Sequence, residues 1–422
     1  MWPFGSKEAR GSSSPENASI PVSAENFLAF FGVQSHKLPA VDVYSALQVP
    51  AVWAAVMFLS RTLATVPLHA FRKTDGGPKK LSGKIETVVG FAPNDYQDTF
   101  KFRQYFWQQV FTHGRGLAWI DRTPQGVEAL WPMDPTRTVI KRTFGKVVYQ
   151  FNDIETETYK EYPSEDVIDI PFALRHCGLY HYSPIIMGAK AIQLALAMNE
   201  YGSNFFAGGG VPPLAMTGPL PQGGEAMKRA TNEIFRAIDA AKSSDKPIFG
   251  LPPGHDLKPV GFDPEKGQMT DARRFQIEEI ARVYQMPPVF LQDLTNGTFS
   301  NTEQQDLFFV KHLISQWSSA LEGELNLKIF GRGNNSRYVR HDLDGLLRGD
   351  LLSRMTALSK GVQTAIYTPD EAREKENLPK QPNGDKLYIQ GATAPLGTQT
   401  YGQQENEPAA DNSNLESGKQ AA

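Results

Sequence analysis

The sequence predicts an α+β fold, and three observations indicate that class. Apolar residues recur at helical spacing in two stretches before residue 112. Short segments rich in β-branched and aromatic residues then follow one another between residues 116 and 171, separated by turn dipeptides. Helical patterns return from residue 184 onward. Because strands and helices occupy separate stretches and no solenoid-length repeat is present, we expect an antiparallel meander flanked by helices.

Composition excludes several classes of protein. A chain of 422 residues has room for two or three domains, and its formal net charge of −3 does not favour a broad basic surface that grips nucleic acid. Cys177 is the single cysteine, so neither an internal disulfide nor a cysteine metal cluster can form. The longest apolar run, 49–59, is too short to cross a membrane, and the first residues lack the pattern of a secretory signal. We expect a soluble protein without a membrane partner.

The first third of the chain predicts an arm followed by helices. Residues 1–35 are rich in Ser, Gly and Pro, and we expect a flexible arm there. An apolar knot at 27–31 is either a docking patch or part of plain disorder. Residues 52–63 predict a buried helix leading into a strand at 67–72, and residues 99–111 predict a helix with an aromatic face.

The middle of the chain predicts a series of strands. Turns such as Gln125-Gly126 and Asp134-Pro135 separate them, as in an antiparallel meander. The predicted strands are 116–121, 127–131, 137–141, 146–151 and 167–171. Basic pairs at 72–73, 79–80 and 141–142 lie on hairpins or strand ends, where we favour solvated turns over contacts with phosphate.

Two helices and an insert follow. Pro184 opens an alanine-rich helix that runs to about residue 207 and stops at three glycines, 208–210. Residues 211–262 form an insert bounded by Pro and Gly, with one amphipathic helix between two expected strands. A further helix is predicted over 271–286 and ends at Pro287 and Pro288.

A polar loop and a long helix come next. Ser300 or Asn301 is predicted to cap the helix, with Glu303 or Gln304 near the reciprocal capping position. An apolar stripe along the helix must face the core of its own subunit or a neighbouring subunit. The predicted packing residues are Leu307, Val310, Ile314, Trp317 and Leu321.

The C-terminal part predicts a strand, capped helices and a tail. A strand is expected at 338–343, and Asp350 is a suitable cap for the next helix. Thr368, Pro369 and Glu371 form the pattern of a capping box with proline at the first helical position. From Thr398 to residue 422 aliphatic residues are scarce, and we expect disorder.

Catalytic and metal-binding patterns do not emerge. The chain lacks a phosphate-binding glycine loop, a nucleophile elbow and a zinc-protease motif. His176, Cys177 and His181 have metal-ligand chemistry, but their spacing fits none of the usual zinc sites. The acidic residues at 342, 344 and 350 likewise depart from a calcium loop. We therefore predict no enzyme, no cofactor and no metal, although a triad hidden in the fold is an alternative.

Three blocks of sequence resemble one protein family. They are Pro287-Pro288 with Leu291 followed by TFSNTEQQ at 298–305, then DLDGLLRGD at 342–350, and IYTPDEAR at 366–373. Their order and spacing resemble the portal (head–tail connector) proteins of tailed bacteriophages. Weaker similarity extends from about residue 40 to about residue 397.

The resemblance implies a portal-type fold and an assignment for each segment. It implies a strand-rich wing, a helical stem, an α/β clip and a helical crown, assembled as a ring of about twelve subunits. The implied segments are 36–183 wing, 184–210 stem helix, 211–262 clip, 263–286 second stem helix, 287–302 tunnel loop, 303–349 long wing helix and return strand, and 350–397 crown helices.

The resemblance also implies a function and partners. The ring would stand at a unique vertex of the capsid in the virion, after assembly in the host cytoplasm, and would pass double-stranded DNA during packaging and ejection. Its partners would be the terminase large subunit, a head–tail adaptor and the major capsid protein. The implied channel-facing residues are Thr295, Asn296, Gly297, Thr298, Phe299, Ser300 and Asn301. A portal-like component of a gene-transfer particle and an unrelated enzyme are the alternatives.

Overall fold

The computed structural model describes residues 40–389, apart from 154–157, 176–177, 208–213, 218–227, 230–231, 235, 237–255, 260–267, 293–298, 334–335, 347–350 and 377. The predicted N-terminal arm and C-terminal tail lie outside these residues. The chain divides into two compact units, of which the first ends at Leu343 and the second begins at Asp344. None of the described helices is long and apolar enough to cross a membrane.

Four helices open the first unit, and local capping sets where they begin. They are α2 (Val43–Leu47), α3 (Pro50–Thr65), α4 (Lys84–Gly90) and α5 (Thr99–His113). The Asp98 carboxylate accepts a hydrogen bond from the Lys101 backbone N–H at 2.7 Å, which satisfies a free donor of the first turn of α5. Gly114 ends α5 at a positive φ of 84°. The helices predicted at 52–63 and 99–111 are confirmed and are slightly longer than expected.

Antiparallel pairing forms the sheets of the first unit. One sheet has the order β13-β1-β2, a second β4-β3-β8, and a third β5-β6-β7. The bounds are β1 Leu68–Thr74, β2 Gly77–Lys80, β3 Arg115–Thr123, β4 Gly126–Met133, β5 Thr138–Thr143, β6 Lys146–Asn152, β7 Tyr159–Pro163, β8 Val167–Pro171 and β13 Arg337–His341. A short pair, β9 (Ala173–Leu174) and β10 (His181–Tyr182), follows β8.

The five strands predicted between residues 116 and 171 are confirmed, but they form two antiparallel sheets instead of one meander, because β8 returns to pair with β3. Besides the short strands β9 and β10, the sequence analysis did not predict β2 and β7. Strand β2 consists of Gly, Pro and two lysines, and β7 carries Lys and Glu between tyrosines. Neither shows an alternation of apolar and polar residues, because each lies at the edge of its sheet and buries little. Pairing with β1 and β6 supplies the structure that composition does not indicate.

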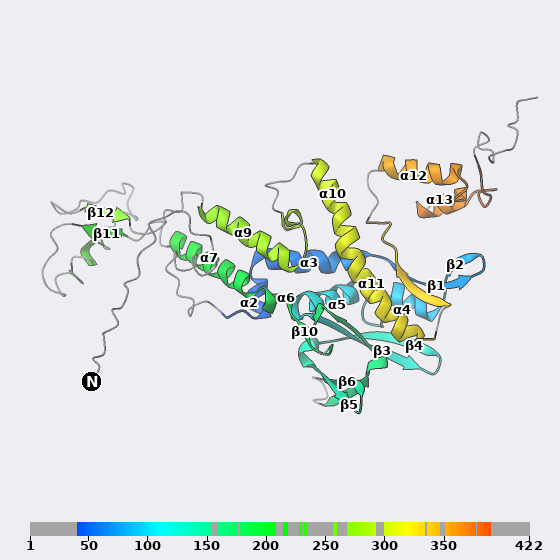
Figure 1. The fold of residues 1–422 in the computed structure, drawn as a ribbon, viewed down its shortest axis with the longest axis horizontal. Coiled ribbons are helices and arrows are strands. Elements are labelled where there is room, and N and C mark those ends of the chain that lie inside the picture. The colour runs from blue at the N-terminus through cyan, green and yellow to red at the C-terminus, as the bar shows by residue number, and fades with distance from the viewer. Residues whose placement is uncertain are drawn as a thin grey trace, which may run out of the picture. The chain divides into compact units, whose positions relative to one another are not determined.

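The main core lies between α3, α5, α11 (Ser315–Leu325) and strand β3 (Figure 1). Trp107 and Phe111 of α5 are completely buried in it, as is Leu59 of α3. Arg103 is also buried and donates to the carbonyl oxygens of Val66 and Val89, both at 2.6 Å. Burial lowers the pKa of Arg103 to about 10, so the guanidinium remains charged at neutral pH and ties α5 to the ends of α3 and α4.

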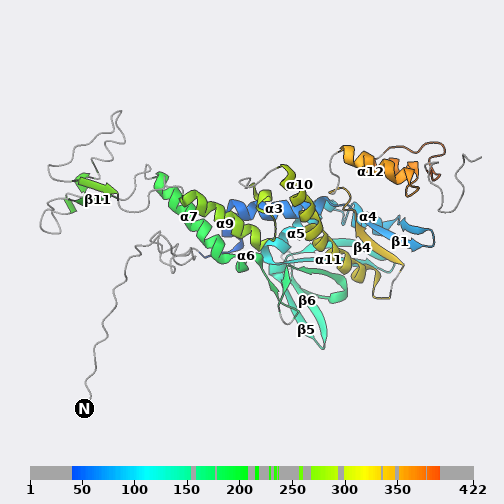
Figure 2. The same cartoon turned by 45° about the horizontal axis from the view of Figure 1, so that its top comes forward.

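A smaller core attaches the third sheet to the second. Its buried members are Leu117, Met133, Tyr149 and Val167, with Trp119, Ile140, Val147, Phe151 and Tyr162 packed around them. From this core the β5–β6 hairpin extends away from the helices, as the two views in Figures 1 and 2 agree.

The helix predicted to start at Pro184 is divided into α6 (Pro184–Met187) and α7 (Ala189–Ala207). Ser183 caps α6, as its position before proline indicates. The break lies at Gly188, where α9 approaches closely: a Cβ there would lie 3.0 Å from a methyl of Val283. Val283 ends α9 (Gln268–Val283), which lies beside α7 in both views. The helix predicted at 271–286 therefore ends three residues early.

The insert at 211–262 is described only in part. Strands β11 (Leu214–Thr217) and β12 (Asp256–Pro259) pair antiparallel, which confirms the two strands expected there. Most of the amphipathic helix predicted between them lies outside the described residues, as do the glycines at 208–210.

The long helix is continuous but not uniform. It consists of α10 (Phe299–Phe309), η6 (Val310–Ile314), α11 and η7 (Asn326–Phe330), and both η segments are π-helical. It begins at Phe299, so Ser300 and Asn301 lie in its first turn. The prediction that either residue caps the helix is therefore wrong by two or three positions, since the cap directly precedes the first helical residue.

The second unit contains α12 (Leu351–Gln363) and α13 (Pro369–Lys375). The predicted capping box is confirmed: Thr368 Oγ1 accepts from the Glu371 N–H, and the Glu371 carboxylate accepts from the Thr368 N–H. Glu376 pairs with Arg354 at 2.8 Å and joins the two helices. The predicted cap Asp350 lies outside the described residues.

Candidate functional site

The predicted channel-facing segment lies at the junction of two elements. Thr295 to Thr298 are outside the described residues, whereas Phe299 to Asn301 form the start of α10. Before the loop, the chain passes from α9 into the short helix η5 (Pro288–Leu291). The structure therefore describes the elements on each side of the loop, η5 before it and α10 after it. Their contacts with the core show how these elements are held.

Three phenylalanines join η5, α10 and α3. Phe290 of η5 lies 4.5 Å from Phe309 of α10, measured between ring centroids. Phe58 of α3 contacts both rings, at 5.2 and 5.4 Å. Aromatic pairs at such distances contribute beyond their buried area. The segment before the loop and the C-terminal end of α10 are therefore fixed to each other and to α3.

Buried contacts at the end of α9 strengthen the same junction. Tyr284 is 2% exposed, and its hydroxyl donates to the carbonyl oxygen of Phe111 at 3.1 Å. Burial raises the pKa of Tyr284, so the hydroxyl remains a donor throughout the neutral range. Gln285 then adopts a positive φ of 57°, and Met286 is again buried. The turn before Pro287 is consequently held by the core.

The predicted packing stripe of the long helix is buried along most of its length. Val310, Ile314 and Leu321 are at most 6% exposed. Trp317 lies among three other rings, with its centroid 5.7 Å from Trp107, 5.4 Å from Phe111 and 5.6 Å from Phe172. In the described chain these residues pack against their own subunit.

Leu307 departs from this stripe. Its side chain is 56% exposed, whereas Phe309, two residues later, is 4% exposed. Both residues precede the π-helical segment η6, and residues two apart lie on nearly opposite sides of an α-helix, so Phe309 faces the core while Leu307 faces away from it. Leu307 is therefore wrong as a packing residue within this chain, and a role against a neighbouring subunit stays a prediction.

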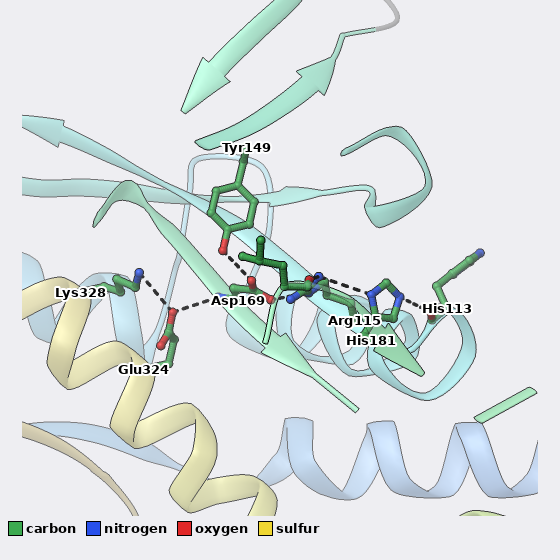
Figure 3. Close-up of polar contacts among 8 residues, drawn as sticks. His113, Arg115, Tyr149, Asp169, His181, Glu324 and Lys328 are labelled. Carbon is green, nitrogen blue, oxygen red and sulfur yellow. Dashed lines mark hydrogen bonds and ion pairs between the residues drawn. The ribbon is translucent and has the colours of Figure 1, made fainter. Parts of the chain in front are cut away.

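A buried polar network, which the sequence analysis did not identify, joins the long helix to the sheets (Figure 3). Asp169 of β8 pairs with Arg115 of β3 at 2.7 Å and accepts from the Tyr149 hydroxyl of β6 at 2.5 Å. The Asp169 backbone N–H donates to Glu324 of α11 at 3.3 Å, and Glu324 lies 3.5 Å from Lys328. Burial and the Asp169 charge raise the pKa of Tyr149.

One feature of the sequence could have indicated this network. Asp169 interrupts an otherwise apolar strand, Val167–Pro171, and an acidic residue in such a place is buried only when it is paired. Its partners could not be found in the same way, because Arg115 and Glu324 lie 54 and 155 residues away.

His181 belongs to the same network rather than to a metal site. Its Nε2 donates to the His113 carbonyl oxygen at 3.0 Å, which leaves Nδ1 to accept from Arg115 at 3.4 Å. Burial and the neighbouring Arg115 charge lower the pKa of His181. His176 and Cys177 lie outside the described residues, and among the described ones no group of three metal-ligating side chains is present. Asp344 pairs with Lys375 at 3.1 Å instead of lining a calcium loop.

Comparison with known proteins identifies the family. The family model described as phage portal protein matches residues 50–377, which is most of the chain. The chain belongs to the phage portal protein family. It is a structural, non-enzymatic protein and a component of the tailed-phage virion.

Two curated relatives agree. The portal protein of Enterobacteria phage HK97 is 27% identical over 383 residues, which cover 89% of this chain and 88% of the relative. The probable portal protein of Streptomyces phage phiC31 is 28% identical over 355 residues, covering 82% and 78%.

Solved structures share the fold at low identity. A chain of the native gene transfer agent (GTA) particle matches with a TM-score of 0.54 at 17% identity, over 85% of this chain and 100% of that one. An HK97-family phage portal protein from Corynebacterium diphtheriae matches with a TM-score of 0.51 at 16% identity, over 72% and 95%. The expected α+β portal-type fold is confirmed, and the family implies a ring oligomer at a capsid vertex.

Proposed function

We propose that about twelve copies of this portal protein form the ring at a unique capsid vertex, through which double-stranded DNA is packaged and later ejected. The loop at 293–298 and the start of α10 narrow the channel. The observation that carries the proposal is the anchoring on each side of the loop: Phe58, Phe290 and Phe309 hold the segment before the loop and the C-terminal end of α10 on the core. Elements fixed in this way can carry a loop that contacts a moving polymer without being displaced themselves.

Residue chemistry supports passage of DNA rather than tight binding. The segment from Thr295 to Asn301 contains no charged residue. Each lysine or arginine placed against the phosphate backbone strengthens binding and makes it dependent on salt. A polar, uncharged loop gives weak contacts that are independent of base sequence, as a channel requires.

The partners follow from the same proposal. The insert at 211–262 contacts the terminase large subunit during packaging and a head–tail adaptor afterwards, and the strand-rich part contacts the major capsid protein. A second candidate is a portal of a gene-transfer particle, which carries cellular DNA. The match to the GTA particle favours keeping this candidate. The genes that surround the coding sequence distinguish the two.

Measuring the mass of the purified assembly tests the proposal. Mass photometry should give about 560 kDa, because the subunit mass is 46.8 kDa and the ring holds about twelve copies. Face-on images should show a hole wide enough for duplex DNA. A monomer or dimer at every salt and protein concentration, together with absence from assembled capsids, would contradict the proposed ring.

Alanine substitutions test the loop separately. Changing Thr298, Phe299 and Ser300 together to alanine should leave the ring intact, because alanine suits the helical positions 299 and 300, and Phe58, Phe290 and Phe309 still anchor the neighbouring elements. The packaged DNA length or the infectious titre should fall severalfold. Alanines at Thr123, the last residue of β3, and at Gln125, in the turn that follows, are the matched control. Normal packaging and titre in the loop variant would remove the loop from the mechanism.

A further inference from the structure

The tip of the β5–β6 hairpin has an unusual residue. Thr143 pairs with Lys146, so Phe144 and Gly145 form a two-residue turn. Both have positive φ, 51° for Phe144 and 79° for Gly145, as in the type I′ turn of hairpins. Asn, Asp and Gly favour the first position, whereas a bulky side chain is strained there. Phe144 thus occupies a turn position at which its backbone conformation lowers the stability of the folded hairpin.

No contact within the described chain offsets this strain. Phe144 is 103% exposed, the highest value among the large apolar side chains of the described residues. Its ring contacts no other described aromatic residue or cation. An unfavourable backbone conformation with an exposed aromatic side chain is typical of residues that act between molecules.

The base of the hairpin is rigid. Tyr149 is 4% exposed and bonded to Asp169, which Arg115 holds from the next sheet (Figure 3). On the same hairpin, Arg137 lies over the ring of Phe151 at 5.7 Å. A tip on such a base needs little further ordering when it binds, and this raises affinity.

The tip is also positively charged. Residues 135–152 contain no Asp or Glu, while Lys141, Arg142 and Lys146 surround Phe144 and are exposed. Within the described residues these three cations have no ion-pair partner. Elsewhere the chain is acidic on balance, since its net charge is −3. The charge of the tip is therefore a local property that attracts an acidic partner.

We propose that Phe144 inserts into an apolar pocket on an acidic protein surface, with Lys141, Arg142 and Lys146 facing its carboxylates. The inference rests on the proposed function, under which the capsid shell protein surrounds the ring and is this partner. A DNA duplex fits less well. A side chain enters its base stack only by kinking it, and three cations give weak, strongly salt-dependent contacts.

The test combines stability with incorporation into capsids. The variant Phe144→Asn places a favoured residue in the turn, so Tm of the full-length ring should rise by about 2 °C. Co-expressed with the capsid shell protein of the same genome, this variant should enter shells about tenfold less than the unchanged chain. Phe144→Leu should retain most incorporation, because leucine still fills an apolar pocket. Gln125→Asn at the β3–β4 turn is the control and should change nothing.

Each result decides the proposal. Normal incorporation of Phe144→Asn would overturn it, since the side chain would then make no important contact with the shell. A lower Tm of this variant would also overturn it, since Phe144 would then not be strained. A photo-crosslinking amino acid at position 144 should join the ring to the shell protein. Crosslinks to packaged DNA or to a second portal chain instead would also overturn it. If the unchanged chain neither forms rings nor enters shells, the proposed function itself fails, which is a distinct result.

Discussion

The two halves of the long helix carry the same kind of apolar pattern in different surroundings. In α11, Leu321 and Leu325 are at most 6% exposed, and Trp317 lies among the rings of the core. In α10, Leu307 and Phe308 are 56% and 53% exposed. An apolar period therefore predicts a helix reliably, but it does not say whether the chain itself or another molecule covers the apolar face.

The π-helical segment η6 marks the boundary between the halves. Such π-helical segments are rare within α-helices and are frequent at functional sites. Directly before η6, Phe309 packs against Phe58 and Phe290, whereas Leu307 lies on the opposite side of α10 and is exposed. The same helix thus serves the core with one half and, we expect, a neighbouring subunit with the other.

Substitution of Trp317 should have the largest effect. Trp317→Ala removes a ring packed against three others and should lower the free energy of unfolding by about 3–5 kcal/mol, as measured by urea denaturation. Trp317→Asp and Leu321→Asp should prevent folding or ring formation. Trp53→Ala is the matched control, because Trp53 is 48% exposed. Native-like rings from both aspartate variants would show that α11 does not carry the core.

Leu307→Asp should separate assembly from folding. The side chain is half exposed, so the free energy of unfolding of the chain should change by about 0.5 kcal/mol or less. Ring formation, followed by mass photometry, should be lost, because a charge would be buried without a partner between subunits. Gln304→Asp, also exposed and on α10, is the control for added charge. Intact rings from Leu307→Asp would leave this face without a partner.

The smallest effect concerns pH and the C-terminal part of α11. His341 of β13 is buried, and its Nδ1 lies 2.9 Å from Glu322. Burial lowers the pKa of His341 most, and Arg103 lowers it further, although Glu322 opposes both. Below a pH of about 6.5 the unfolded chain then binds more protons than the folded chain, so stability is complete above that pH and is lost as the pH falls.

The slope of stability against pH checks this. Below a pH of about 6.5, one such histidine lowers the free energy of unfolding by at most about 1.4 kcal/mol for each pH unit. His113 and His181, whose pKa values are also lowered by burial, add slopes of the same sign. His341→Asn keeps a donor for Glu322 and should flatten the profile between pH 5.5 and 7.5, a window set by the ordinary histidine pKa of about 6.5. An unchanged profile in this variant would contradict the assignment.

The sequence by itself determined the features that depend on near neighbours. Thr368 and Glu371 cap α13, and Ser183 and Pro184 begin α6, because donor and acceptor stand within three residues of each other. The strands of the meander followed from alternation and turn residues, and the family from three short blocks. The polar loop before α10 was placed by two prolines and one glycine.

Tertiary structure decided what depends on distant contacts. The close approach of α9 to Gly188 depends on Val283, the exposure of Leu307 on which side of α10 the core covers, and the network around Asp169 on residues of other elements. The strain at Phe144 arises because pairing of β5 with β6 imposes a positive φ at the turn. Local rules report the preferences of a few consecutive residues, whereas burial and pairing depend on which segments meet, and only the folded chain determines that.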